Sequence, residues 1–206
     1  MTNEKYTYSI SAAGRVNLIG EHVDYCGGKV MPAALSLKNT IFARPNGTDK
    51  INLAWTDIPV RVTLDISRLS EYKDVKFANY PAGSAYLWQQ AGHPIVGCDL
   101  LYDCTVPFGS GLSSSAAIEV STIAALATLA GEKLDPVKIA LVAQKAEREY
   151  AGVNCGIMDQ YASAFGKKDN AILLDCNTLV REYVPIVLGD FTLVIANCNK
   201  PHSLVE

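Results

Sequence analysis

The spacing of apolar residues along the chain predicts strands towards both ends and helices between them. Residues 6–13 alternate polar and apolar side chains as a half-buried strand does, and short apolar runs bounded by turn residues indicate the other strands. The strands predicted in this way span residues 6–13, 40–43, 51–55, 60–64, 99–106, 171–174, 180–184 and 191–196.

Helical periodicity and helix-ending residues predict four helices. An apolar stripe from Ala116 to Ala127 marks one face of a helix that Gly131 ends. Asp135 and Pro136 supply an N-cap and a first-turn proline for the next helix, which runs to about Tyr150. The predicted helices span residues 77–91, 113–130, 136–150 and 157–165.

The order of these elements is strands, then helices, then strands. This order favours an α+β fold in which helices pack on one face of a mixed β-sheet, and it lacks the regular alternation of βαβ units. The last predicted strand, 191–196, is of a buried type, and the chain stops ten residues after it. We therefore expect the chain to be one piece of a longer protein.

Composition narrows the classes of function. The 206 residues are 49% hydrophobic with a net charge of -3 and no cluster of Lys and Arg, so nucleic acid is not an expected partner. No apolar run approaches a membrane span, and the N-terminus carries no signal-peptide core, so we expect a cytoplasmic protein without a membrane partner. The six cysteines are scattered and are expected to be reduced, and His93 and His202 are predicted to lie at the surface.

A glycine- and serine-rich loop is a candidate phosphate site. Gly109-Ser110-Gly111 follows a predicted strand, and Ser113-Ser114-Ser115 opens the next helix, whose free N–H groups and dipole favour an anion. The dipole contributes only about 0.3–2 kcal/mol, so a bound triphosphate would need a metal ion as well. No Gly-Lys-Ser/Thr follows, which excludes a Walker A loop. An ordinary flexible turn with serine N-caps fits the same residues.

A polar cluster near the N-terminus is a candidate sugar site. Arg15, Glu21, His22, Asp24 and Tyr25 fall within eleven residues. Carboxylates and imidazole make directional hydrogen bonds to hydroxyls, and arginine suits phosphate or carboxylate oxygens. A solvated loop with ordinary surface charges is the alternative.

Two further acidic residues are candidates for chemistry. Asp159 falls in the first turn of a predicted helix. There its negative charge either interacts favourably with the helix dipole or receives a proton from a substrate hydroxyl. Glu147 is a possible metal ligand, although its neighbours Arg148 and Glu149 are more typical of a solvated helix face.

Taken together, these segments resemble the galactokinases of the GHMP small-molecule kinase family. Residues 14–25 match the galactokinase signature, 107–117 resemble the family's ATP loop, and 155–160 resemble the segment that holds its catalytic aspartate. The resemblance covers essentially the whole chain and implies that residues 1–206 form a GHMP-kinase N-terminal domain, of the ribosomal protein S5 domain 2-like fold. It further implies that the family's C-terminal domain, a partner of this one, is missing.

The resemblance also implies an activity, the ATP-dependent phosphorylation of the C1 hydroxyl of galactose with Mg²⁺ as cofactor. Asp159 would be the catalytic base, and Arg15 would stabilise charge on the transferring phosphoryl group. The implied binding residues are Glu21, His22, Val23, Asp24 and Gly156 for the sugar, Gly109, Ser110, Gly111, Leu112, Ser113, Ser114, Ser115 and Phe77 for the nucleotide, and Ser115 and Glu147 for the metal.

Departures from the family pattern leave alternatives open. Val23 stands where the family has threonine, Cys26 where it has asparagine, and Phe77 where it has an adenine-packing tryptophan. Cysteine at the second of these places also occurs in N-acetylgalactosamine kinases, and some relatives are non-catalytic galactose sensors. Such sensors can lack a Ser-Ala pair in the phosphate loop, whereas Ser113-Ser114-Ser115-Ala116-Ala117 is intact here, which favours catalysis. Since family members are nearly twice as long, the fragment alone is expected to be weakly active or inactive.

Overall fold

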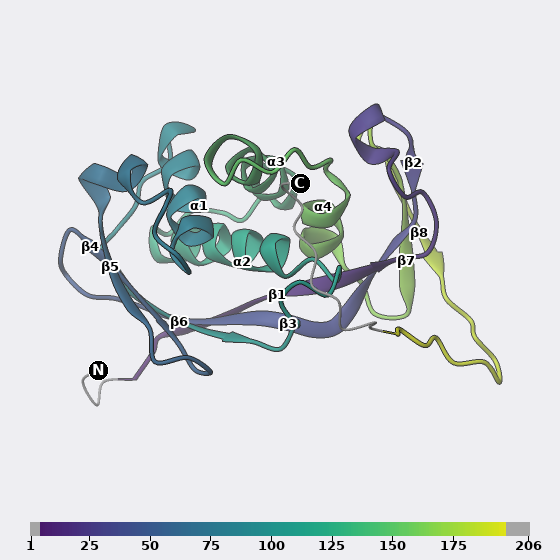
Figure 1. Cartoon of the computed structure of the whole chain (residues 1–206), viewed down its shortest axis with the longest axis horizontal. Coiled ribbons are helices and arrows are strands. Elements are labelled where there is room, and N and C mark those ends of the chain that lie inside the picture. The colour runs from purple at the N-terminus through teal and green to yellow at the C-terminus, as the bar shows by residue number, and fades with distance from the viewer. Residues whose placement is uncertain (1–4, 197–206) are drawn as a thin grey trace.

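The computed structural model describes residues 5–196 and shows one mixed sheet with helices on one face (Figure 1). The strands are β1 (Tyr8–Asn17), β2 (Lys29–Val30), β3 (Pro32–Pro45), β4 (Lys50–Trp55), β5 (Arg61–Asp65), β6 (Cys98–Cys104), β7 (Asn170–Asp175) and β8 (Arg181–Pro185). Their spatial order is β2-β7-β3-β6-β4-β5, with β1 beside β3 and β8 beside β7. The β4–β6 pair is parallel and the other pairs are antiparallel, so the predicted α+β fold with a mixed sheet is confirmed.

The long strand β3 connects the two ends of the sheet, because it pairs with β1, β6 and β7 along its fourteen residues. Strand β1 is longer than the predicted 6–13 and carries the first polar motif on its end. Its register shifts between Ala13 and Arg15, where the Arg15 N–H donates to the Leu112 carbonyl at 3.1 Å. A Cβ at Gly14 would lie 2.7 Å from the same carbonyl oxygen. Glycine there lets β1 approach the glycine- and serine-rich loop.

The helices are α1 (Asn79–Gln90), α2 (Ser114–Leu129), α3 (Pro136–Lys145) and α4 (Met158–Phe165), and a π-helical turn, η3 (Ala146–Tyr150), continues α3. Short 3-10 turns lie at η1 (Asp24–Cys26) and η2 (Ile66–Glu71). The side chain of Asp135 accepts from the Val137 and Lys138 N–H groups, as the N-cap prediction requires.

Helix α2 is the centre of the molecule. Every residue from Ala116 to Ala127 is buried, so the single apolar stripe predicted for this helix understates its burial. The reason is that α2 contacts helices α1, α3 and α4 as well as strands β1 and β3. A helix enclosed on all sides shows little amphipathic periodicity.

Two predictions are wrong. Residues 191–196 form no strand, and Phe191 is 83% exposed, because β8 pairs only with β7 and no described strand lies beside these residues. His93 is not a free surface residue. Its ring stacks on Trp88 with centroids 3.7 Å apart, its Nδ1 is 2.9 Å from a Glu132 carboxylate oxygen, and only 15% of the side chain is exposed. His202 lies outside the described residues.

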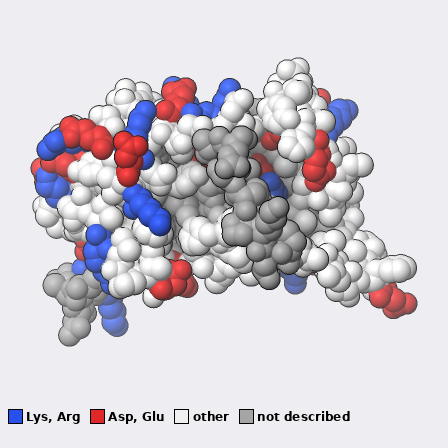
Figure 2. Space-filling model, in the orientation of Figure 1, with Lys and Arg blue, Asp and Glu red and all other residues white. Residues whose placement is uncertain are grey.

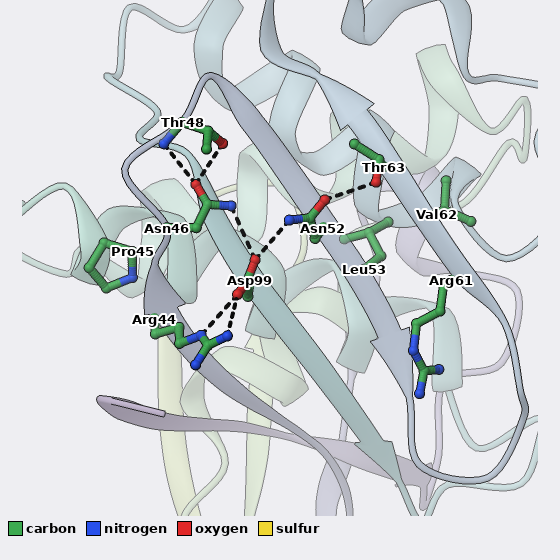
Figure 3. Close-up of a pocket in the computed structure, with 10 residues that line it drawn as sticks. All are labelled: Arg44, Pro45, Asn46, Thr48, Asn52, Leu53, Arg61, Val62, Thr63 and Asp99. Atoms are coloured by element: carbon green, nitrogen blue, oxygen red, sulfur yellow. Dashed lines mark hydrogen bonds and ion pairs between the residues drawn. The ribbon is translucent and has the colours of Figure 1, made fainter. Parts of the chain in front are cut away.

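The sheet face opposite the helices carries a row of polar side chains in register across four strands (Figure 3). Asp99 on β6 accepts from Arg44 on β3 and from Asn52 on β4, and Asn52 accepts from Thr63 on β5. These residues line a cavity of about 700 Å³. Since their polar groups bond one another, the row stabilises the sheet as cross-strand pairs do.

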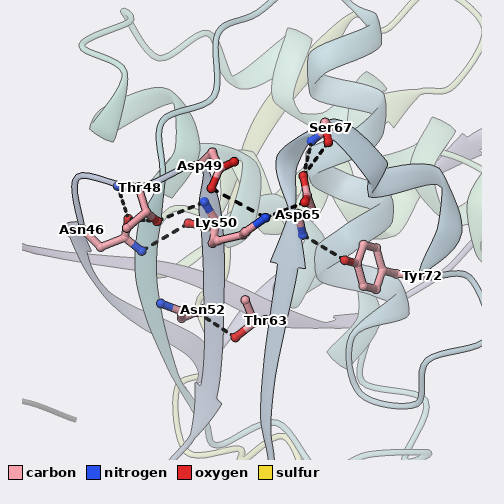
Figure 4. Close-up of polar contacts among 9 residues, drawn as sticks. All are labelled: Asn46, Thr48, Asp49, Lys50, Asn52, Thr63, Asp65, Ser67 and Tyr72. Carbon is pink, nitrogen blue, oxygen red and sulfur yellow. Dashed lines mark hydrogen bonds and ion pairs between the residues drawn. The ribbon is translucent and has the colours of Figure 1, made fainter.

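The β4–β5 hairpin has a second polar network at its open end (Figure 4). Lys50 pairs with Asp65 at 2.5 Å, and Asp65 also accepts from the N–H and hydroxyl of Ser67 at the start of η2. On the face shown in Figure 2, acidic and basic side chains are interspersed over the surface. Within residues 5–196, no helix is both long and apolar enough to cross a membrane.

Candidate functional site

A cavity of about 970 Å³ lies where the end of β1, the glycine- and serine-rich loop, and the starts of α2 and α4 come together. Fourteen of the residues named from the sequence line it: Arg15, Glu21, His22, Asp24, Tyr25, Gly109, Gly111, Leu112, Ser113, Ser114, Ser115, Glu147, Gly156 and Asp159. The two sequence motifs and the aspartate at the helix start therefore share one cavity.

Asp159 is held by three donors from two other segments. The Arg15 guanidinium donates from Nε to Oδ1 at 2.8 Å and from Nη2 to Oδ2 at 2.9 Å, and the Ser113 hydroxyl donates to Oδ2 at 2.6 Å. Charge-assisted, two-point pairing of this kind fixes both position and orientation. The Ser113 hydroxyl donates to Asp159 and makes no capping hydrogen bond to α2, which differs from the serine N-cap considered from the sequence.

The loop that leads into α2 has an unusual backbone. Gly109, Gly111 and Ser113 all have positive φ, at 67°, 74° and 61°, and this conformation explains the two glycines. No other group lies within 4 Å of where a Cβ would stand on either glycine, so the space beside the loop is open. Ser110 donates its hydroxyl to the Pro107 carbonyl at 2.7 Å and does not line the cavity.

Glu147 is buried, with 3% exposure. The interpretation that it lies on a solvated helix face, which its charged neighbours favoured, is therefore wrong. Burial raises the pKa of Glu147, while a hydrogen bond with Ser115 acts in the opposite direction. Gln160 donates from Nε2 to Glu147 Oε2 at 2.5 Å. A carboxylate beside a serine hydroxyl fits Mg²⁺, which takes one or two protein ligands and completes its shell with phosphate oxygens and water. Within residues 5–196, no group of three or more His, Cys, Asp or Glu side chains is arranged to hold a metal ion.

The polar cluster near the N-terminus meets the start of helix α4 at Gly156. A Cβ on Gly156 would overlap the carboxylate of Asp24, and the Met158 N–H lies 3.4 Å from Asp24 Oδ2. Glycine at this position therefore lets a carboxylate from the N-terminal motif sit against the start of α4. His22 has a positive φ of 60°, and its Nδ1 lies 3.2 Å from the Tyr25 hydroxyl.

Two other residues named from the sequence, Val23 and Phe77, do not line the cavity. Val23 packs in a small core cluster, 2.8 Å from where a Cβ would stand on Gly28. Phe77 has a φ of 66° just before α1, and its ring lies 6.3 Å from Trp55 and beneath the ammonium group of Lys76. Neither of them is among the residues that line the cavity in the described part of the chain.

Sequence reasoning missed four residues at the site. Asn17 and Tyr80 line the cavity, and Glu119 and Gln160 lie buried beside Glu147. Asn17 was within the first motif, and Gln160 directly follows Asp159, so proximity to named residues was the available signal. A glutamate on an otherwise apolar helix was the signal for Glu119.

Comparison with known proteins agrees with this geometry. Residues 79–167 match the family described as GHMP kinases N terminal domain, and residues 2–45 match the galactokinase galactose-binding signature. The chain is 44% identical over 194 residues to a galactokinase of Clostridium tetani, covering 94% of this chain and 50% of the relative. It is 39% identical over 209 residues to one of Lactobacillus helveticus, covering 100% and 54%.

Among solved structures, Lactococcus lactis galactokinase complexed with galactose matches with a TM-score of 0.92 and 38% identity, covering 96% of this chain and 52% of that one. The chain therefore belongs to the GHMP kinase family, and it carries the family's N-terminal domain together with the galactokinase signature. It spans about half the length of the relatives it matches.

Proposed function

We propose that the protein carrying this chain transfers the γ-phosphoryl group of ATP to the C1 hydroxyl of galactose and gives galactose 1-phosphate. The observation that carries the proposal is the convergence of Arg15, Asp159 and Ser113 in the same cavity as the sugar motif and the loop before α2. The names of the galactokinase relatives support galactose as the acceptor.

Each part of the cavity has a role in this reaction. Glu21, His22, Asp24 and the backbone at Gly156 bind sugar hydroxyls, and Asp159 orients the C1 hydroxyl and accepts its proton. Arg15 holds Asp159 in place and stabilises negative charge on the transferring group. The N–H groups of residues 109–115 cradle the phosphates. Ser115 and Glu147 would hold a magnesium ion, which neutralises phosphate charge when bound.

We further propose that residues 1–206 form one domain and that a second domain completes the nucleotide site. The assignments of Val23 to the sugar and of Phe77 to the nucleotide stay predictions, and neither residue lines the cavity of the described chain. The chain alone is then expected to turn over poorly. If the 206-residue chain alone turned over as fast as the full-length protein, this part of the proposal would be contradicted.

The test is phosphorylation by the full-length protein with galactose, N-acetylgalactosamine and arabinose as acceptors, followed by coupled ADP release. A preference for galactose supports the proposal. A preference for N-acetylgalactosamine would assign a different sugar kinase, and sugar binding without ADP release would indicate a galactose sensor. Cytoplasmic localisation remains a prediction.

A further inference from the structure

Two polar side chains, Glu119 and Gln160, are fully buried behind the serine-rich start of α2. Both are 0% exposed. Glu119 lies on α2, four residues after Ser115, among alanine and aliphatic residues, and Gln160 lies on α4 directly after Asp159. Burying such groups costs about 1–3 kcal/mol each unless they are hydrogen-bonded. An apolar residue at either position would fill the core at lower cost, so the polar groups need another explanation.

The hydrogen bonds of the pair point to Glu147. The Gln160 amide donates from Nε2 to Glu147 Oε2 at 2.5 Å and to Glu119 Oε2 at 3.3 Å. One amide thus connects two carboxyl groups that come from α2 and η3. Glu119 Oε1 and Gln160 Oε1 are buried and have no partner. Each residue thus keeps one buried oxygen without a hydrogen bond, while Gln160 supplies Glu147 with a donor.

The positions of these residues on their helices tie the pair to the site. Because α2 carries both Ser115 and Glu119 one turn apart, a shift of Glu119 would also shift the hydroxyl that bonds Glu147. Since Gln160 follows Asp159, the turn of α4 that presents Asp159 to Arg15 also fixes the Glu147 carboxylate. Side chains that bond a metal ligand from behind set its orientation, and their loss costs about 10–100-fold in metal affinity or activity.

We propose that Glu119 and Gln160 are positioning residues that hold the Glu147 carboxylate beside Ser115 in the orientation that the magnesium of a nucleotide complex requires. The proposal rests on the proposed function only in assigning that metal to Ser115 and Glu147. Neither residue touches substrate, since both act through Glu147.

The test measures metal binding without turnover, in the full-length protein. Free Mn²⁺ is counted by electron paramagnetic resonance during titration of protein mixed with AMP-PNP, and galactose-dependent ADP release is measured separately. Glu119→Leu and Gln160→Met keep the volume of each side chain but remove its polar atoms. Both are expected to weaken Mn²⁺ binding about 10–100-fold and to raise the magnesium requirement of turnover, with little change in the KM for galactose.

Two controls separate positioning from packing. Glu119→Gln keeps an oxygen that accepts from Gln160, and it is expected to restore most of the Mn²⁺ affinity that Glu119→Leu loses. Ile123→Val, one turn further along α2 and also 0% exposed, is expected to lower thermal stability without changing Mn²⁺ affinity.

The outcomes are distinct. Unchanged Mn²⁺ affinity in Glu119→Leu or Gln160→Met overturns the proposal, and so does loss of the folded state in both variants, because the pair would then serve the core. Absence of Mn²⁺ binding by the unmodified protein overturns the inference together with the metal assignment. The expected pattern of Mn²⁺ affinities without phosphorylation of galactose would reject the proposed function and leave the positioning role standing.

Discussion

Arg15 and Asp159 are 144 residues apart in the sequence and form a two-point ion pair inside the cavity. The same guanidinium donates from Nη1 to the carbonyl of Gly111 at 2.5 Å. One side chain on β1 therefore connects the loop before α2 with the first turn of α4. This connection fixes the distance between the loop that we propose binds phosphate and the Asp159 carboxylate that we propose receives the proton.

Replacement of Arg15 by lysine is expected to lower kcat by about 10²–10³-fold, because an ammonium group cannot bond both oxygens of Asp159 and a carbonyl at once. The sugar affinity should change less. Steady-state kinetics of Arg15→Lys in the full-length protein checks this expectation. Arg44→Lys is the matched control, since Arg44 makes a similar pair with Asp99 on the far face of the sheet. An equal loss of kcat in both variants would show that ion-pair loss acts through stability.

Replacement of Asp159 by alanine is expected to lower turnover by about 10²–10⁴-fold, the range for loss of a positioned proton acceptor. Galactose binding, measured by calorimetry, should weaken less than turnover does, because Asp24, Glu21 and His22 remain in the cavity. Near-normal turnover in Asp159→Ala would remove this carboxylate from the mechanism.

Local signals in the sequence were sufficient for most elements. Gly131, Asp135 and Pro136 bounded two helices, and Asp159 was correctly placed in a first helical turn. These signals act through the backbone of a few neighbouring residues, so they need no tertiary context.

Burial of single residues depended on tertiary partners and was not predictable in the same way. Glu147 precedes charged neighbours that favour a solvated helix face. It is nevertheless buried, because it lies in the π-helical turn η3 and accepts a hydrogen bond from Gln160 on α4. The apolar residues 191–196 indicated a strand, but apolar composition does not supply a neighbouring strand to pair with. Phe77 has a positive φ, and α1 therefore begins after it and not at residue 77 as predicted. The residue type gave no warning of this, because a positive φ is expected of glycine and not of phenylalanine.

The stability of the sheet is expected to depend on pH through Asp99. Burial raises the pKa of this carboxyl, but hydrogen bonds from Asn52, Asn46 and Arg44 outweigh it and hold the pKa below its ordinary value of 3.8. A lowered pKa means that ionised Asp99 stabilises the fold above about pH 4 and that this contribution is lost as the pH falls through the lower, folded-state value.

Thermal unfolding of the unmodified chain and of Asp99→Asn at a series of pH values measures this contribution. The variant should be less stable near neutral pH, and the difference should narrow below about pH 4. Asp74→Asn, which removes an exposed aspartate, is the control for a change in surface charge. A difference that stays constant down to low pH would contradict the assignment to Asp99.

The contact between Gly156 and Asp24 gives a test of the proposed sugar-binding part of the cavity that leaves the Arg15–Asp159 ion pair intact. In Gly156→Ala the new methyl group would occupy the place of the Asp24 carboxylate, so Asp24 must move away from the start of α4. Because the Asp24 carboxylate would then lie at a different distance from the sugar hydroxyl, we expect the KM for galactose to rise about tenfold or more, the effect of losing about 1.4 kcal/mol of binding free energy.

Gly131→Ala is the control. Gly131 has a positive φ of 72° and no group within 4 Å of the added Cβ, so this variant should lose about 1 kcal/mol of stability and keep its KM. If the KM of Gly156→Ala is also unchanged, Asp24 does not bind the sugar from the position it has beside Gly156.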